Sequence, residues 1–234
     1  MSLRTEQTEP DAGGAHGDRG PYVSRGGIKL ENALRAAALP VRGRKALDIG
    51  ASTGGFTDCL LQAGAAAVTA VDVGYGQFDW GLRNDPRVHI LERVNARALT
   101  RESLDYVPDL AVIDVSFISI AKVLPAVLTC LSSEHDVLAL VKPQFEVGRA
   151  NVGKGGVVRS AEERQRALVS VAESALQLGE CVLGYYPAGI AGPKGNRETF
   201  LWSADGGRGG GTRDPERLPA LATAAEPAEE GHTP

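Results

Sequence analysis

Residues 47 to 57, LDIGASTGGFT, contain the first pattern in the chain that could bind a ligand. The glycines at positions 50, 54 and 55 allow the backbone to turn sharply and a ligand to approach it closely. The apolar residues before them predict a strand, and the helix expected after them would turn its N-terminus, which attracts anions, toward the same ligand. This arrangement predicts a nucleotide-like cofactor on the loop.

The residue types around the loop distinguish between cofactors. The glycines have the spacing of a phosphate-binding loop, but Phe56 stands where that loop requires a lysine, so ATP and GTP are not expected. Ser52 replaces the second glycine of the dinucleotide fingerprint, which leaves NAD as the runner-up. Asp48 precedes the glycines, and Asp72 ends the next apolar run, where a carboxylate can hold a ribose. Two carboxylates and no lysine favour a cationic, phosphate-free cofactor, and S-adenosylmethionine is one.

Four charged residues at the ends of apolar runs could take part in acid–base chemistry. Asp114 follows LAVI and Lys142 follows VLALV, so both are expected at the carboxyl end of a strand. Lys29 follows SRGG near the start of a predicted helix, and Glu198 precedes the last apolar run. Singly, each also has a structural interpretation as a turn cap, a solvated lysine or a loop acid. Only their combination in one site would give them a chemical role.

Apolar segments alternate with helical patterns between residues 22 and 204. Strands are expected at residues 45–49, 68–73, 87–91, 109–115, 136–142, 181–186 and 199–203, and helices at 30–39, 54–64, 121–131 and 161–179. This alternation predicts the α/β class, with a doubly wound, Rossmann-like, mainly parallel sheet of about seven strands. No helix separates the last two strands, so the last strand is expected to be antiparallel. Ligands of such sheets bind at the carboxyl ends of the strands, where Asp114 and Lys142 fall.

Composition bounds the domain organisation and the compartment. With 234 residues and 43% hydrophobic content, the chain is expected to form one domain over residues 22–204, between polar tails without regular structure at 1–21 and 205–234. No apolar run approaches the roughly 20 residues that span a bilayer, and no signal peptide precedes the domain, so a cytoplasmic protein is expected. Three isolated cysteines are expected in the core, with neither a disulfide nor a metal site: Cys59, Cys130 and Cys181.

The distribution of charge is more informative than the net charge of −4. Residues 1–21 carry two arginines and four acids, and residues 205–234 carry three arginines and six acids, so the remaining residues have a net charge of +1. Between Tyr22 and Ala46, six Lys or Arg residues face a single acid, Glu31. This segment is predicted either to bind phosphates or to form a solvated helix face.

Seven motifs extend the interpretation to a family. YVSRGGIKLENAL, LDIGASTGGFTDCLLQAGA, VDVGYGQFDWGLRNDPRV, VIDVSFIS, LVKPQFEVGR, KGGVVR and GPKGNRETF occur in the order seen in the TlyA, or hemolysin-like, group of FtsJ-like methyltransferases. The chain resembles this group over about residues 22 to 203. The resemblance implies an S-adenosylmethionine-dependent methyltransferase acting on a ribose 2′-hydroxyl of ribosomal RNA. It also implies a catalytic tetrad, which falls on Lys29, Asp114, Lys142 and Glu198.

The resemblance also implies roles for these residues. Lys142 is expected to act as the base, Lys29 to stabilise the developing alkoxide, and the two acids to fix the lysines. VNAR, residues 94–97, is expected beside the adenine. The expected cofactor-binding residues are Asp48, Gly50, Ser52, Thr53, Gly54, Gly55, Phe56, Asp72, Val73, Asn95, Ala96, Arg97 and Asp114. Among the aromatic residues, Phe117 is the one expected to contact a ligand, and Trp80 is expected to pack in the core.

Two departures from the family pattern leave alternatives open. Members of the group carry a small RNA-binding module before YVSRGG, whereas this chain has a polar segment there and is expected to lack the module. The family's VVRDP is replaced by VVRSA, in a loop over 148–160 that could border the substrate entrance. The partner is expected to be ribosomal RNA or a ribosomal subunit. The alternatives are a small-molecule or peptide acceptor and a non-enzymatic, membrane-lytic role. The sequence does not indicate the oligomeric state.

Overall fold

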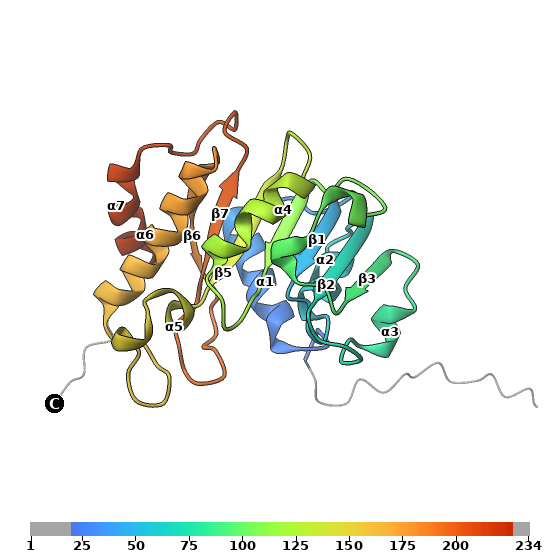
Figure 1. The fold of residues 1–234 in the computed structure, drawn as a ribbon, viewed down its shortest axis with the longest axis horizontal. Helices are drawn as coiled ribbons and strands as arrows, with labels where there is room; N and C mark the ends of the chain where they lie inside the picture. Colours follow the sequence, from blue (N-terminus) through green and yellow to red (C-terminus); the bar gives the residue numbers. More distant parts are fainter. Residues whose placement is uncertain (1–19, 227–234) are drawn as a thin grey trace, which may run out of the picture.

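Seven strands form one sheet in the computed structural model, which describes residues 20–226 (Figure 1). The strands are β1 Lys45–Ile49, β2 Ala67–Asp72, β3 Val88–Glu92, β4 Leu110–Ile113, β5 Asp136–Val141, β6 Cys181–Pro187 and β7 Thr199–Ala204. Their spatial order is β3-β2-β1-β4-β5-β7-β6. The first five strands pair in parallel, and β7 pairs antiparallel with both β5 and β6. The predicted fold class, strand number and antiparallel last strand are confirmed.

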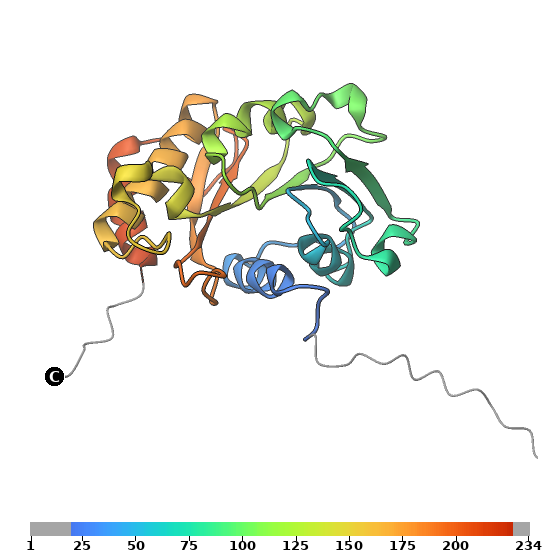
Figure 2. The ribbon, with the colours of Figure 1, turned by 60° about the horizontal axis from the view of Figure 1, so that its bottom comes forward.

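Helices cover both faces of the sheet (Figure 2). They are α1 Arg25–Ala37, α2 Gly55–Gln62, α3 Trp80–Arg83, α4 Leu124–Cys130, α5 Pro143–Glu146, α6 Ala161–Gln177 and α7 Leu218–Ala225. One core lies between the sheet and α1 and α2, and a second lies between the sheet and α4, α6 and α7. Neighbouring residues of one strand enter opposite cores, Ala46 the first and Leu47 the second. Burial on both faces explains why the strands read as continuous apolar runs.

The helix α1 is fixed at both ends by local hydrogen bonds. Ser24 is its N-cap and accepts a hydrogen bond from the backbone N–H of Gly26, and Ala38 closes it in the left-handed conformation. The helix begins five residues before the predicted start at position 30, because the capping serine precedes the apolar face. Lys29 therefore lies on the helix itself, close to the sheet.

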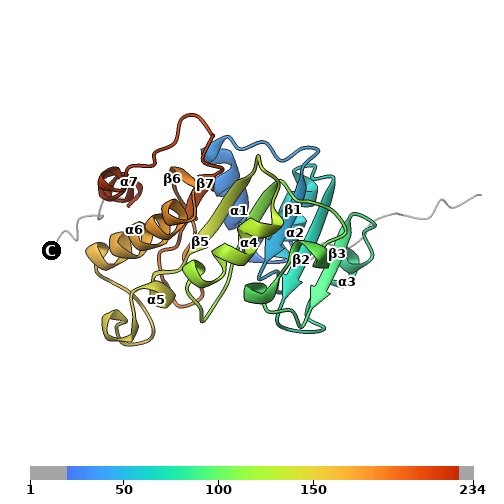
Figure 3. The same ribbon diagram turned by 45° about the horizontal axis from the view of Figure 1, so that its top comes forward.

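The segment after residue 204 corrects the sequence prediction. A polar tail was expected over 205–234, but Thr212 pairs with Val182 beside the sheet, and α7 packs on α6 and β6 (Figure 3). Leu218 and Ala222, one helical turn apart, are fully buried. The glycines and charges of 205–217 conceal this short apolar face, so the prediction is wrong for 205–226. Residues 227–234, like the N-terminal segment 1–19, lie outside the described residues.

Two further expectations from the sequence concern the cysteines and membrane-spanning segments. All three cysteines are buried and free, as predicted. Among residues 20–226, no helix has the length and apolar character needed to cross a membrane.

Candidate active site

The glycine loop after β1 packs against the end of β4. Gly50 has a φ of +87°, and a Cβ built on it would lie 2.5 Å from the carbonyl oxygen of Asp114. Only glycine accommodates both the left-handed backbone and this close approach. The loop is thereby held beside the carboxylate that follows β4.

A second close contact holds α1 against the same loop. A Cβ on Gly55 would lie 2.0 Å from Oγ of Ser24, and a Cβ on Gly27 would lie 2.3 Å from the ring of Tyr22. The glycines of SRGG and of the loop therefore let the N-termini of α1 and α2 meet. This contact explains how a helix at the start of the domain brings Lys29 to the carboxyl edge of the sheet.

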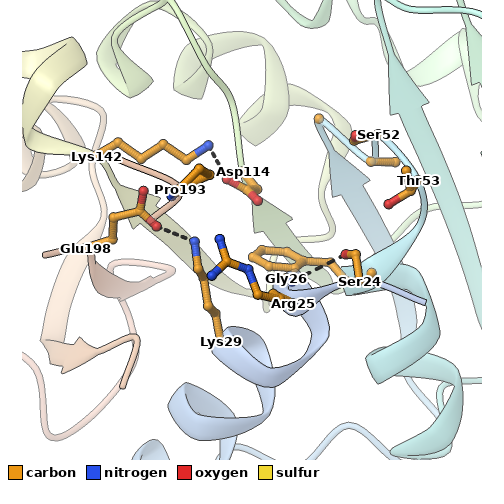
Figure 4. Close-up of a pocket in the computed structure, with 14 residues that line it drawn as sticks. Ser24, Arg25, Gly26, Lys29, Ser52, Thr53, Asp114, Lys142, Pro193 and Glu198 are labelled. Atoms are coloured by element: carbon orange, nitrogen blue, oxygen red, sulfur yellow. Dashed lines mark hydrogen bonds and ion pairs between the residues drawn. The ribbon is translucent and has the colours of Figure 1, made fainter. Parts of the chain in front are cut away.

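The four predicted acid–base residues line one cavity of about 400 Å³, which we call the tetrad cavity (Figure 4). They form two ion pairs: Lys29 Nζ lies 2.5 Å from Oε2 of Glu198, and Lys142 Nζ lies 2.6 Å from Oδ1 of Asp114. Lys142 also donates a hydrogen bond of 2.9 Å to Oγ of Ser116. Residues from α1, β4, β5 and the segment before β7 are thus brought together.

The two pairs differ in their access to solvent. Both side chains of the Lys29–Glu198 pair are buried, so each charge requires the other. The side chains of Lys142 and Asp114 are 12% and 23% exposed. Lys142 is therefore the lysine that an entering molecule can reach more easily, while Lys29 is held in a fixed position.

A neighbouring cavity of about 560 Å³, the cofactor cavity, shares Gly50, Ser52 and Asp114 with the tetrad cavity. Asp72 lies at its edge, where its two carboxylate oxygens accept hydrogen bonds from the backbone N–H groups of Ser52, at 2.8 Å, and Gly74, at 2.6 Å. Both bonds fix the carboxylate at the end of β2. Predicted cofactor residues that line this cavity are Gly50, Ser52, Asp72, Val73, Asn95, Ala96, Arg97 and Asp114. Those that line the tetrad cavity are Gly50, Ser52, Thr53, Gly55, Phe56 and Asp114.

Asp48 and Gly54 are predicted cofactor residues that line neither cavity. Asp48 is fully buried, and its Oδ2 accepts a hydrogen bond of 2.7 Å from Oγ1 of Thr57 on α2. Burial, together with the charges of Asp114 and Asp72, raises the pKa of Asp48 to about 7, against the opposing effect of the Thr57 hydrogen bond. Through this hydrogen bond, the Asp48 carboxylate contacts α2.

An exposed aromatic side chain, Phe117, lies next to the tetrad. Phe117 is 91% exposed, has a φ of +65° and lies 5.1 Å from the ring of Phe145, measured between centroids. It lines a third cavity of about 300 Å³, the outer cavity, together with Lys142 and Glu198. An exposed ring in a strained backbone conformation next to the tetrad is consistent with the expected ligand contact. Trp80 was expected in the core but is 78% exposed, so that prediction is wrong.

Five residues that line the tetrad cavity were missed from the site prediction: Ser24, Arg25, Gly26, Ala51 and Pro193. The sequence motifs contain these residues: SRGG ends two residues before Lys29, Ala51 belongs to the glycine loop, and GPKGNRE contains both Pro193 and Glu198. Figure 4 shows the Arg25 side chain beside Lys29. A cation at this point adds to the positive charge of the two lysines.

The basic segment predicted between Tyr22 and Ala46 does not form one surface. Lys29 is buried in its pair with Glu198, and Arg44 forms ion pairs with Asp109 and Asp136 at the opposite edge of the sheet. Arg35 pairs with Glu31 on α1. Helix and strand geometry separate charges that are adjacent in the sequence. Residues 22–46 therefore do not provide a single phosphate-binding surface.

Comparison with known proteins identifies the family. The model of the FtsJ-like methyltransferases matches residues 22–204. The chain belongs to this family. The FtsJ-like domain accounts for the whole sheet and for all four members of the tetrad, and the chain is an S-adenosylmethionine-dependent methyltransferase.

Several known proteins are similar to this chain over most of its length. The chain is 55% identical over 181 residues to the 16S/23S rRNA (cytidine-2′-O)-methyltransferase TlyA of Mycobacterium tuberculosis, covering 77% of this chain and 68% of that protein. It is 43% identical over 178 residues to Hemolysin A of Brachyspira hyodysenteriae, covering 76% and 74%. A solved structure named as a hemolysin, from Streptococcus thermophilus, matches with a TM-score of 0.82 at 41% identity, covering 89% and 76%. The predicted resemblance to the TlyA group is confirmed.

The cofactor cavity of this FtsJ-like domain fits S-adenosylmethionine. Its loop has no lysine for phosphates, and the fixed carboxylate of Asp72 suits ribose hydroxyls. Apolar side chains of Val71, Val94 and Ile118 also line the cavity and suit an adenine ring.

Proposed function

We propose that the protein transfers a methyl group from S-adenosylmethionine to a ribose 2′-hydroxyl of ribosomal RNA. The observation that carries this proposal is the pair of lysine–carboxylate contacts, Lys29–Glu198 and Lys142–Asp114, in one cavity that borders the cofactor cavity. A ribose hydroxyl is a very weak acid, so its methylation requires a positioned base and a field that favours the alkoxide.

Lys142 is proposed as the base. S-adenosylmethionine supplies an electrophilic methyl group bound to a positively charged sulfur. Lys142, after releasing its own proton to solvent, would accept the proton of the hydroxyl while the oxygen bonds to the methyl group and the methyl–sulfur bond breaks, which would leave S-adenosylhomocysteine. Asp114 then pairs with the ammonium group that results, and Ser116 orients the amine through its hydrogen bond.

Lys29 is proposed to stabilise the negative charge that develops on the hydroxyl oxygen. Its ammonium group is fixed by the buried Glu198 carboxylate and therefore needs no reorganisation during the reaction. Arg25, at the same cavity, adds to the favourable field.

The cofactor is proposed to lie along the glycine loop. Asp72 would hold the ribose hydroxyls, the backbone of residues 95–97 would face the adenine, and the loop would contact the methionine portion. Asp48 is now proposed to act only through Thr57 and α2.

The proposal of a ribosomal RNA acceptor is supported by the relatives and by the outer cavity. The relative from M. tuberculosis, at 55% identity, is named for the 2′-O-methylation of cytidines in 16S and 23S rRNA. Phe117 offers an exposed ring on which a base can stack beside the tetrad. The alternative of a small-molecule acceptor gains no support from the relatives.

Transfer of tritiated methyl groups to purified ribosomal subunits and to naked rRNA tests the proposal. We expect labelled RNA with the wild-type protein, loss of label with Lys142→Ala, and full label with Lys45→Ala, an exposed lysine at the opposite edge of the sheet. Mass spectrometry of nucleosides should place the methyl group on a ribose. A wild-type protein that binds the cofactor but labels neither substrate would refute an rRNA acceptor.

A further inference from the structure

Two loops lie side by side at the edge of the outer cavity. One covers residues 148–160, between α5 and α6, and the other covers residues 188–198, between β6 and β7; both project below α5 and β7 in Figure 1. Val152 and Gly156 of the first and Lys194 and Asn196 of the second line the outer cavity. The loops are far apart in the sequence, so a specific contact must hold them together.

Asn196 provides that contact. Its side chain is buried, its Oδ1 accepts a hydrogen bond of 2.9 Å from the N–H of Val158, and its Nδ2 donates one of 2.8 Å to the carbonyl of Gly156. Its own carbonyl accepts a hydrogen bond of 2.9 Å from the N–H of Gly192. The side chain of Asn196 thus bonds to the first loop through both its oxygen and its nitrogen, while its backbone carbonyl closes a turn in the second loop. The two loops therefore form a single unit.

The two loops joined by Asn196 are rich in cations, and their one acid, Glu198, is buried in its ion pair with Lys29. Residues 148–160 contain three cations and no acid, and residues 188–197 contain two cations and no acid. All five cations are exposed and form no ion pair with another described residue: Arg149, Lys154, Arg159, Lys194 and Arg197. Lys194 lies across Gly156, where a Cβ would come within 3.6 Å of its Nζ. The Lys194 side chain of one loop therefore lies close to the backbone of the other.

We propose that these two loops, locked by Asn196, form one rigid basic surface that binds phosphates of the acceptor RNA beside the target nucleotide. The proposal rests on the proposed RNA methyltransferase function and replaces the basic segment 22–46 as the phosphate-binding surface. Cations without acidic partners attract a polyanion, and their fixed positions reduce the ordering cost of binding. Asn196 is a positioning residue, since it acts through the loops.

The salt dependence of RNA binding tests the surface. Affinity of the wild type, of Lys154→Gln/Lys194→Gln and of the matched control Arg42→Gln/Lys45→Gln is measured for one rRNA fragment over a range of salt concentrations. Each lost phosphate contact lowers the slope of log K against log salt by about 0.7–0.9. We expect the loop variant to lose about 1.5 in slope and about 10-fold in affinity at low salt, with unchanged binding of S-adenosylhomocysteine and an unaffected control. An equal slope in all three proteins overturns the proposal.

This outcome is distinct from failure of the function. If the wild type methylates RNA and the loop variant keeps its slope, only the basic surface is wrong. If the wild type neither binds nor methylates RNA, the proposed function is wrong as well.

Variants of Asn196 test the lock. We expect Asn196→Ala to raise KM for RNA about 10-fold with a smaller loss in kcat, to leave the dissociation constant of S-adenosylhomocysteine unchanged, and to increase amide hydrogen exchange over residues 153–158. Asn196→Asp keeps the acceptor for Val158 but loses the donor to Gly156, so it should be intermediate. Wild-type KM and exchange rates in both variants would show that the loops are held without Asn196.

Discussion

At the scale of single residues, the proposed role of Lys142 as a base can be tested separately from the effect of its positive charge. Lys142→Arg keeps a cation beside Asp114, but a guanidinium cannot be deprotonated and so cannot accept the hydroxyl proton. We expect the methyl-transfer rate to fall by roughly 100- to 10,000-fold, as for loss of a general base, in both Lys142→Arg and Lys142→Ala. Single-turnover transfer to RNA measures this rate. An arginine variant with more than a tenth of wild-type activity would assign Lys142 an electrostatic role.

Asp48 gives a prediction for pH. Because its pKa is about 7 in the folded protein and 3.8 in the unfolded chain, the unfolded chain releases its proton first as pH rises. The free energy of unfolding therefore decreases between about pH 4 and pH 7, by roughly 1.4 kcal/mol for each unit of difference in pKa. Asp48→Asn, which can still accept from Thr57, should lack this decrease. Urea denaturation at a series of pH values compares the two proteins, and parallel curves would contradict the assignment.

Phe117 is expected to contribute to RNA binding and not to the stability of the folded protein. Its ring is 91% exposed, so Phe117→Ala should change the free energy of unfolding by less than about 0.5 kcal/mol. Loss of one stacked base costs about 1–3 kcal/mol, so KM for RNA should rise roughly 5- to 100-fold. Phe117→Tyr keeps the ring and serves as the control. A KM that is the same in all three proteins would exclude stacking on this residue.

Residue types and motifs predicted the members of the site but not their contacts. The sequence grouped Lys29 with Glu198 only through family resemblance, because 169 residues separate them and no local pattern reports on such a pair. Asp48 was predicted as a cofactor residue from its place before the glycines, and no sequence pattern indicated its buried hydrogen bond to Thr57. Arg44 was counted as a free cation for the same reason, although it is paired across the sheet.

At the scale of elements, Gly192 sets the position of Glu198. A Cβ on Gly192 would lie 2.4 Å from Oε1 of Glu198, so Gly192→Ala should displace the carboxylate from Lys29. We expect the rate of methyl transfer to fall roughly 100-fold, the scale seen when a stabilising group at a developing oxyanion is lost. Gly209→Ala, where a Cβ meets nothing within 4 Å, is the matched control. Equal rates in the two variants would show that Glu198 tolerates the shift.

Elements were predictable where burial imposes a pattern. Six of the seven strands are largely buried apolar runs, β3 at the sheet edge is half-buried, and α6 repeats its apolar residues at helical spacing, so these elements could be predicted from the sequence. The single-turn helices α3 and α5 have too few residues for a period; α3 is capped by the side chain of Asp79, and α5 begins at Pro143. Such short helices depend on caps and tertiary contacts, which sequence patterns describe poorly.

At the scale of the whole molecule, α7 should contribute stability and not chemistry. Leu218 is fully buried in the core that also includes α6, so Leu218→Ala should lower the free energy of unfolding by about 2–5 kcal/mol. The helix lines neither the tetrad cavity nor the cofactor cavity, so activity per folded molecule should be retained. Thermal denaturation and methyl transfer at low temperature check both statements, with Leu178→Ala, 42% exposed, as the control. A variant as stable as the control would show that α7 is dispensable.

The buried pair of Lys29 and Glu198 also bears on how the protein is made. Synthesis starts at the N-terminus, so Lys29 leaves the ribosome long before its partner, 169 residues later, exists. Until Glu198 is made, Lys29 has no counter-charge at this place, so the ion pair cannot contribute to holding α1 against the sheet during most of translation. The pair forms only once β7, which directly follows Glu198, lies between β5 and β6. A nascent chain is therefore inactive until its last strand is in position, and methyl transfer begins only with the completed domain.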